Sequence, residues 1–348
     1  MSSKTIWESV FGLSADEYLS DLAINQTYHP ELDLIILNYS QIESPKTHPT
    51  VRLCRSLVTD LEYNIVAQGF RRFFNLGEVD DPFDWDNFVI QEKIDGSYIK
   101  LFWHQDRWIV TTRNTFGQGN ISECGPTWEH VVFRNLNLHG LDKTITYVLE
   151  LVGPLNKVVR EYPEGLYLIA ARQYGYELSD RVLDNLSCQI GVKRPKVYQI
   201  DRADLRDWMM KVALADPTFE GLVLRDKGYN RYKFKSKTWY EISRIKNNGH
   251  VASKRGFLEF YLKGEHGELM AMFPEYHEVF SQYENKLNKL ITLAEAEFFH
   301  YNHLGQKDFA LKIKDRPHKS ILFDMRKGKT AREALVGKEK YLLTLLGE

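Results

Sequence analysis

A lysine directly before a turn is the first feature of this sequence that could carry chemistry. Residues 92–103 read EKIDGSYIKLFW, so Lys93 follows one apolar run, and Asp95 and Gly96 precede another. A deprotonated lysine amine can attack phosphorus or a carbonyl carbon, and the end of a strand can hold it rigidly. A surface hairpin with a lysine at its rim has the same pattern. The string alone leaves both interpretations open.

Charged residues recur in strand-like runs on both sides of this lysine. They are Arg55, Arg72, Arg113, Glu150, Glu220, Lys233 and Lys235. Lys233 and Lys235 are two residues apart, so on a strand their side chains share a face and can meet one phosphate. Glu150 lies between two leucines in YVLELVGP. A carboxylate is costly there unless it binds a ribose, a lysine or a metal.

The order of these strings resembles that of a known enzyme superfamily. KIDGS, LELVGP, EGLVL and YKFKS resemble motifs I, III, IV and V of the covalent lysine nucleotidyltransferases. These comprise ATP-dependent RNA and DNA ligases and the messenger-RNA capping guanylyltransferases. The upstream block RRFFNLGE and the string ELVGPLNKVV resemble the bacteriophage RNA ligase 1 family in particular, and the resemblance extends from about Tyr39 to Tyr240.

The resemblance implies a role for the residues of motifs I, III and IV. It makes Lys93 the nucleophile that becomes linked to AMP, while Asp95 and Gly96 shape the nucleotide pocket. It places Glu150 near the ribose hydroxyls and Glu220 near the lysine amine and the metal.

The resemblance also implies a set of basic and aromatic contacts to the nucleotide. The expected phosphate contacts are Arg55, Arg72, Lys233 and Lys235, with Arg113 as a further basic residue. Arg72 and Arg113 stand where the phage enzymes usually have lysine. Tyr39 is expected at the pocket and Tyr167 against adenine.

ATP and Mg²⁺ are the cofactors that the resemblance implies, with Mn²⁺ as a substitute. Glu150 and Glu220 would hold the metal, directly or through water, because magnesium prefers oxygen ligands and retains waters. The implied activity is an ATP-dependent RNA ligase that joins 5′-phosphate and 3′-hydroxyl RNA ends through lysyl-AMP and an adenylylated RNA end. RNA repair is the expected process, and nicked tRNA is one candidate substrate. The alternatives are a capping guanylyltransferase, a DNA ligase, or a non-catalytic RNA-binding protein on the same fold.

Short apolar runs separated by turn residues predict many strands between residues 30 and 245. Residues 88–113 predict an antiparallel meander, and residues 201–215 predict a helix capped by Asp201. Strand groups with intervening helices indicate the α+β class. We therefore expect an antiparallel-sheet nucleotidyltransferase domain over residues 1–245.

Residues 246–348 predict a small all-α domain. Apolar residues at steps of three and four predict an amphipathic helix that begins at Pro274, and residues 331–346 predict a shorter terminal helix. Capping enzymes and DNA ligases carry an OB-fold of short strands after motif V, so a helical domain disfavours both. Residues 307–340 contain eleven Lys or Arg against five Asp or Glu. This excess predicts an RNA-binding surface, although a solvated helix face has the same composition.

The composition sets further limits. The chain has 348 residues, a net charge of −1 and three cysteines, which indicate neither a disulfide framework nor a zinc site. Because no apolar run is long enough to span a bilayer, we expect no membrane partner and a location in the cytoplasm or in a host's cytoplasm. A monomer is the expected oligomeric state. RKGKT at 326–330 ends like a Walker A loop, but Phe323 replaces its first glycine, so no kinase activity is expected. His300 and His303 are expected to be ordinary surface or core histidines.

Overall fold

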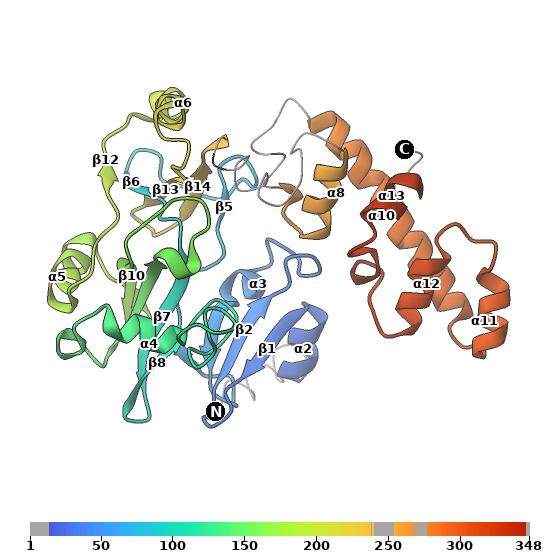
Figure 1. The fold of residues 1–348 in the computed structure, drawn as a ribbon, viewed down its shortest axis with the longest axis horizontal. Coiled ribbons are helices and arrows are strands. Elements are labelled where there is room, and N and C mark those ends of the chain that lie inside the picture. The colour runs from blue at the N-terminus through green and yellow to red at the C-terminus, as the bar shows by residue number, and fades with distance from the viewer. Residues whose placement is uncertain (1–13, 238, 240–253, 268–269, 271–276, 346–348) are drawn as a thin grey trace. The chain divides into compact units, whose positions relative to one another are not determined.

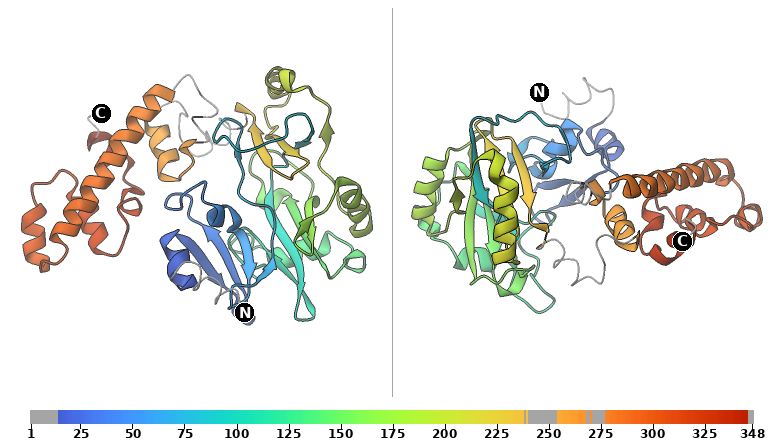
Figure 2. Two further views of the ribbon diagram at one scale, coloured as in Figure 1. Left: turned by 180° about the vertical axis from the view of Figure 1, so that it is seen from behind. Right: turned by 90° about the horizontal axis from the view of Figure 1, so that it is seen from above.

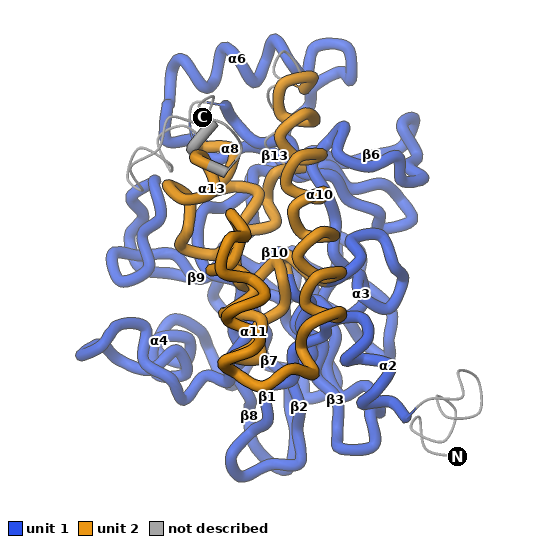
Figure 3. The backbone as a smooth tube through the Cα atoms, turned by 90° about the vertical axis from the view of Figure 1, so that its right-hand side faces the viewer, with its two compact units in different colours: residues 1–40, 44–243 blue, residues 41–43, 244–348 orange. Residues whose placement is uncertain are grey.

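The computed structural model describes residues 14–237, 239, 254–267, 270 and 277–345 (Figure 1). The chain forms two compact units, coloured separately in Figure 3. Unit 1 comprises residues 1–40 and 44–243, and unit 2 comprises residues 41–43 and 244–348. Antiparallel sheets with flanking helices in unit 1 and a helical unit 2 confirm the predicted α+β class.

The first sheet of unit 1 has the strand order β1-β2-β3-β4. Its strands are β1 (Ile24–Tyr28), β2 (Ile35–Tyr39), β3 (Arg55–Thr59) and β4 (Ile65–Ala67). Two helices pack on it, α2 (Ala15–Asp21) and α3 (Pro49–Leu53). Ser14 and Glu17 form a capping box that starts α2, and Pro49 occupies the first turn of α3, where its missing N–H costs nothing.

The second sheet has the order β11-β10-β9-β7-β8 and carries the largest core. Its strands are β7 (Ser97–His104), β8 (Arg107–Thr111), β9 (Ile145–Val152), β10 (Gly165–Gln173) and β11 (Tyr176–Glu177). One face packs apolar residues such as Ile99 and Leu149 against α4 (Trp128–Arg134) and α5 (Asp180–Ile190) (Figure 2). The opposite face therefore carries the alternate residues, Glu150 among them.

The third sheet has the order β12-β6-β13-β14-β5, with β14 and β5 parallel and the other pairs antiparallel. Its strands are β5 (Phe74–Asn75), β6 (Phe88–Glu92), β12 (Val197–Tyr198), β13 (Gly221–Asp226) and β14 (Arg231–Lys235). Its core includes Ile90 and Leu222 and packs against α6 (Leu205–Ala215). Short 3-10 helices lie at Leu138–Gly140, Pro154–Asn156 and Arg202–Asp204.

The predicted meander over residues 88–113 is wrong in its first link. β6 and β7 belong to different sheets, so residues 93–96 are a crossover between sheets and not a hairpin turn. β7 instead pairs with β9, and a Cβ on Gly96 would lie 2.3 Å from the carbonyl oxygen of Leu151. The second link is confirmed, because β7 and β8 form a hairpin whose turn residues Gln105 and Asp106 both have positive φ.

The predicted cap at Asp201 is also wrong. A 3-10 turn precedes α6, and the Asp201 side chain makes no capping hydrogen bond. The predicted helix over residues 201–215 is otherwise present as that turn followed by α6.

Unit 2 is helical throughout the ranges that the structure describes. Its elements are α8 (Lys254–Leu262), α10 (His277–Tyr301), α11 (Gln306–Ile313), α12 (Lys319–Arg326), the 3-10 turn Glu333–Leu335 and α13 (Glu339–Leu345). Phe257 and Phe280 stack in its core with ring centroids 4.9 Å apart. The predicted start of α10 at Pro274 lies outside the described residues. The predicted single helix over residues 331–346 is wrong, because Gly337 with φ +77° separates two shorter elements.

None of the described helices combines the length and the apolar character needed to cross a bilayer.

Candidate active site

Lys93 and Glu220 form an ion pair at the adjoining ends of two paired strands. Lys93 follows β6 and Glu220 precedes β13, and the register places Leu222 opposite Glu92. The backbone N–H of Lys93 donates to the carbonyl of Gly221 at 2.9 Å, and Lys93 Nζ lies 2.7 Å from Glu220 Oε1. Strand pairing therefore brings together two residues that are far apart in the sequence.

The carboxylate of Glu220 is buried, with only 5% of the residue exposed. Burial raises the pKa of Glu220, and the charges of Lys93 and Lys235 oppose that rise. Its second oxygen, Oε2, has no hydrogen-bond partner within the described part of the chain. A buried oxygen without a donor is costly, which indicates a ligand, a metal or a water at this position.

Glu150 lies on the second sheet beside this pair. Its cross-strand neighbours are Tyr98 on β7 and Tyr167 on β10, so the three side chains share one face. Burial raises the pKa of Glu150, Lys93 opposes that rise and Glu220 adds to it, and the resulting pKa is about 7. A Cβ on Gly96 would lie 3.0 Å from Glu150 Cγ, which places Glu150 beside the segment that follows Lys93. Tyr167, the predicted adenine contact, meets the Tyr162 ring edge-on at 6.3 Å between centroids.

Asp95 is buried and bonded to the protein. Its Oδ2 accepts hydrogen bonds from the backbone N–H groups of Val159 and Arg160, at 2.9 and 3.0 Å, and from Trp239 Nε1 at 3.2 Å. It thereby anchors the segment that follows β9 and the residue Trp239 next to Lys93. Trp239 is not among the residues predicted from the sequence, although it stands only two residues beyond the YKFKSK string.

Gly96 is required for close packing. A Cβ there would meet Leu151 O at 2.3 Å and the Cγ atom of Glu150 at 3.0 Å. The absence of a side chain therefore lets β7 start directly beside the strand that carries Glu150.

A cluster of cations surrounds Tyr39, and we call it the cation cluster. It consists of Arg55, Arg72, Arg113 and Lys233. Arg72 Cζ lies 4.1 Å and Arg113 Cζ 5.0 Å from the centroid of the Tyr39 ring. Burial alone would raise the pKa of Tyr39, but the charges of the four cations more than offset this effect and lower it. Such a concentration of positive charge is suited to an anion.

Arg55 links the cation cluster around Tyr39 with the acid Glu150. Its charge acts on both Tyr39 and Glu150, and its guanidinium stacks on Tyr98 at 4.7 Å and on Phe70 at 4.9 Å from the ring centroids. Nη1 of Arg55 is buried without a hydrogen-bond partner in the described residues. This unused donor indicates a ligand with acceptor oxygens.

Lys233 and Lys235 both lie on β14, as predicted for a strand. Lys233 Nζ lies 5.6 Å from the centroid of the Phe73 ring, and Lys235 Nζ lies 5.3 Å from that of Trp239. The charge of Lys235 also lowers the pKa of Glu220, and that of Lys233 lowers the pKa of Tyr39. One lysine of β14 therefore acts on the buried acid, and the other belongs to the cation cluster.

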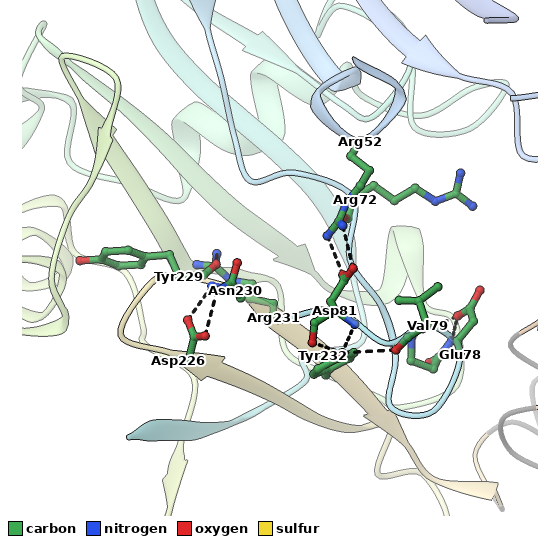
Figure 4. Close-up of polar contacts among 11 residues, drawn as sticks. Arg52, Arg72, Glu78, Val79, Asp81, Asp226, Tyr229, Asn230, Arg231 and Tyr232 are labelled. Atoms are coloured by element: carbon green, nitrogen blue, oxygen red, sulfur yellow. Dashed lines mark hydrogen bonds and ion pairs between the residues drawn. The ribbon is translucent and has the colours of Figure 1, made fainter. Parts of the chain in front are cut away.

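The backbone of Arg72 is fixed by a polar network that the sequence analysis did not predict (Figure 4). Arg52 binds both oxygens of Asp81, at 2.9 and 2.7 Å, and its Nε donates to the carbonyl of Arg72. The hydroxyl of Tyr232 accepts from the backbone N–H of Asp81 at 2.8 Å. In Figure 4 the side chain of Arg72 extends away from the Arg52–Asp81 pair. The network thus holds the carbonyl of Arg72 and the chain at Asp81, and it leaves the Arg72 guanidinium directed elsewhere.

The structure therefore gathers every predicted site residue into one region of unit 1. Within the described ranges, no group of three or more His, Cys, Asp or Glu side chains could hold a metal. A metal held by Glu150 and Glu220 would have to complete its shell with water and ligand oxygens, as magnesium commonly does.

Comparison with known proteins adds the family. A family model described as RNA ligase matches residues 53–240, which is more than half of the chain. The chain belongs to this RNA ligase family. The predicted resemblance to RNA ligase 1 enzymes is thereby confirmed.

Two individual relatives extend the comparison. The chain is 26% identical over 331 residues to a protein of Autographa californica nuclear polyhedrosis virus that is inferred to be a bifunctional polynucleotide kinase/RNA ligase. The match covers 87% of this chain and 46% of the viral protein, so the chain spans about half the length of that relative. An archaeal ATP-dependent RNA ligase shares the fold, with a TM-score of 0.53 at 12% identity, over 80% of this chain and 77% of the archaeal one.

Proposed function

We propose that the protein is an ATP-dependent RNA ligase that joins a 5′-phosphate and a 3′-hydroxyl RNA end through a lysyl-AMP intermediate. The observation that carries the proposal is the 2.7 Å contact between Lys93 Nζ and the buried carboxylate of Glu220, with Glu150 and the cation cluster beside it. The family supports RNA ligation as the reaction.

In the first step the neutral amine of Lys93 attacks the α-phosphorus of ATP. A phosphorus–nitrogen bond forms, the bond to the pyrophosphate oxygen breaks, and the amine must lose a proton. Glu220 Oε1 is within hydrogen-bond distance of Nζ, and its raised pKa makes it a better proton acceptor than an exposed carboxylate. Glu220 thus orients the nucleophile and receives its proton.

Several negative charges must be neutralised while pyrophosphate leaves. Arg55 offers a buried N–H donor that has no hydrogen-bond partner among the described residues, and the cation cluster already lowers the pKa of a buried phenol. Fixed donors of this kind stabilise developing charge without reorganisation. This arrangement supports the proposal that Arg55, Arg72 and Lys233 bind the ATP phosphates.

Glu150 and Glu220 fit a divalent cation, since both are acids in largely buried surroundings and Glu220 Oε2 has no partner in the described part of the chain. Mg²⁺, or Mn²⁺ in its place, would neutralise phosphate charge there when bound. Glu150 is also proposed to bind the ribose hydroxyls, and Tyr167, its cross-strand neighbour on the same face, is proposed to contact adenine.

The later steps transfer the nucleotide to RNA. An oxygen of the RNA 5′-phosphate attacks the phosphorus of lysyl-AMP, the phosphorus–nitrogen bond breaks, and Lys93 recovers its proton. A 3′-hydroxyl then attacks the activated end, a phosphodiester forms and AMP leaves. RNA repair, with nicked tRNA as one substrate, is the process we propose for a monomeric protein in the cytoplasm of a cell or of a virus host.

The helical unit 2 is proposed to bind RNA through its basic residues. Lys327 is largely exposed, with 72% of its side chain accessible, and pairs with Asp324 at the end of α12. Lys329 lies three residues after the end of α12 and is also exposed. Exposed lysines of this kind contribute salt-dependent contacts to phosphates.

One labelling experiment tests the proposal. The protein is incubated with magnesium and α-labelled ATP or GTP, and label on the protein is measured for the wild type and for Lys93→Met. We expect an acid-labile adduct with ATP that requires Lys93, followed by ligation of an RNA with a 5′-phosphate. No adduct with either nucleotide would refute the enzymatic proposal, and an adduct with GTP alone would indicate a capping guanylyltransferase.

A further inference from the structure

A buried lysine outside the predicted motifs lies next to the cation cluster. Lys100 is on β7, its side chain is fully buried, and its Nζ donates a hydrogen bond to the backbone carbonyl of Ser56. The charge that acts on it most strongly is that of Arg55, and it forms no ion pair with an acid of the described ranges. Burying a lysine without an acid is costly, so this position calls for a functional reason.

Ser56 is the extra residue of a β-bulge in β3. The register of β2 and β3 pairs Leu37 with Leu57 but Asn38 with Arg55, which leaves Ser56 without a partner. Its φ of +56° is in the left-handed region, which is unfavourable for a residue with a side chain. Its hydroxyl donates to the carbonyl of Thr112 at 3.0 Å.

The bulge determines which face of the sheet carries Arg55. Side chains alternate along a regular strand, so if Ser56 were paired with Asn38 in an unbulged strand, Arg55 would share a face with Leu57. Leu57 packs with Leu37 in the core beneath α2 and α3. With the bulge, Arg55 lies opposite Asn38 instead, and its guanidinium reaches the ring of Tyr98 on the second sheet.

We propose that Lys100 is a positioning residue for lysyl-AMP formation, because its bond to the Ser56 carbonyl holds the bulge that turns Arg55 toward the ATP phosphates. The hydroxyl of Ser56 ties the same bulge to Thr112, the neighbour of Arg113. One short bulge thus positions two members of the cation cluster. This inference rests on the proposed ligase function.

Lys100→Met tests the inference, because methionine fills a similar volume and cannot donate. We expect the KM for ATP in lysyl-AMP formation to rise about tenfold, which corresponds to the weakening of one arginine–phosphate contact. The melting temperature should stay the same or rise, because an uncompensated buried amine is removed. Ile99→Val is the matched control: it shortens the neighbouring buried residue on the opposite face of β7, and it should lower the melting temperature without changing the KM.

A coupling experiment separates positioning from a general effect on the core. In an Arg55→Ala background, Lys100→Met should raise the KM no further, because both substitutions remove the same contact. Adding Ser56→Gly to Lys100→Met should restore the KM in part, since glycine adopts positive φ without strain. Ser56→Ala, which keeps the Lys100 bond and removes only the hydroxyl that ties the bulge to Thr112, should raise the KM about twofold to threefold.

The outcomes divide clearly. An unchanged KM for Lys100→Met, or an effect that adds fully to that of Arg55→Ala, would overturn the positioning role; if Lys100→Met does not fold, an unchanged KM for Lys100→Leu, which also cannot donate, would do so. Failure of the wild type to form lysyl-AMP would instead overturn the proposed function, and this inference with it.

Discussion

Replacing Glu220 with glutamine is the most direct test of the site's chemistry. The substitution keeps the shape of the side chain and removes the charge that lies 2.7 Å from Lys93 Nζ. At an effective dielectric constant near 20, two unit charges at this separation attract by roughly 6 kcal/mol before desolvation is counted. Desolvation of the buried carboxylate offsets part of this attraction, but glutamine leaves the Lys93 ammonium without its charge partner, so the melting temperature is expected to fall.

The effect on rate is expected to be large. Glutamine cannot accept the proton of Lys93 and does not hold the amine through charge, and loss of such a group slows a reaction about 10²-fold to 10⁴-fold. Because Glu220 is also proposed to hold the divalent cation, the KM for ATP should rise as well, and the rate at saturating ATP isolates its effect on the nucleophile.

The assay is single-turnover formation of lysyl-AMP from α-labelled ATP over a range of ATP concentrations. Asp180→Asn is the matched control: it breaks the pair that Asp180 forms with the buried Arg225 elsewhere in unit 1 and should leave the rate unchanged. Lysyl-AMP formation by Glu220→Gln at the wild-type rate would refute the role of Glu220 as orienting group and proton acceptor.

Three further predictions concern packing, pH and RNA. Gly96→Ala should slow lysyl-AMP formation about tenfold or more and lower the melting temperature, because the new methyl group would lie 2.3 Å from Leu151 O; wild-type values for both would contradict this packing. Burial, and then Arg55, lowers the pKa of Lys100 to about 7, so above that pH the unfolded chain binds one proton more than the folded one. The free energy of unfolding should therefore rise between about pH 7 and 10, by up to about 1.4 kcal/mol per pH unit. Urea unfolding of Lys100→Met at several pH values should show a free energy of unfolding without this rise. Charge reversal at Lys327 and Lys329 should weaken RNA binding and reduce its salt dependence while lysyl-AMP formation stays at the wild-type level, and unchanged binding in a filter assay would remove the proposed RNA surface.

The sequence by itself was sufficient to predict the class of fold and to name the candidate site residues. Lys93 in KIDGS, Glu150 in an apolar run and the pair Lys233 and Lys235 are local signals, because each depends on residue type and on spacings of a few positions. The change from strand-like to helical periodicity near residue 245 is equally local, and it predicted a helical second unit.

Only the tertiary structure decided how those residues meet. The strings before and after Lys93 read as two strands joined by a turn, and that pattern is the same whether the strands pair with each other or cross between sheets. The pairing of β7 with β9, some fifty residues away, shows that the chain crosses between sheets at Lys93, and it places Glu150 near Lys93.

The direction of Arg55 depends on the same kind of long-range information. A bulge of one residue at Ser56 moves Arg55 to the other face of its strand, and no local pattern in RLCRSLVTD marks that residue as unpaired. The partners that stabilise the bulge, Lys100 and Thr112, come from β7 and from the end of β8. Residue types and short spacings therefore determined which groups are available for chemistry. Strand register, which depends on the packing of the whole unit, determined where they point.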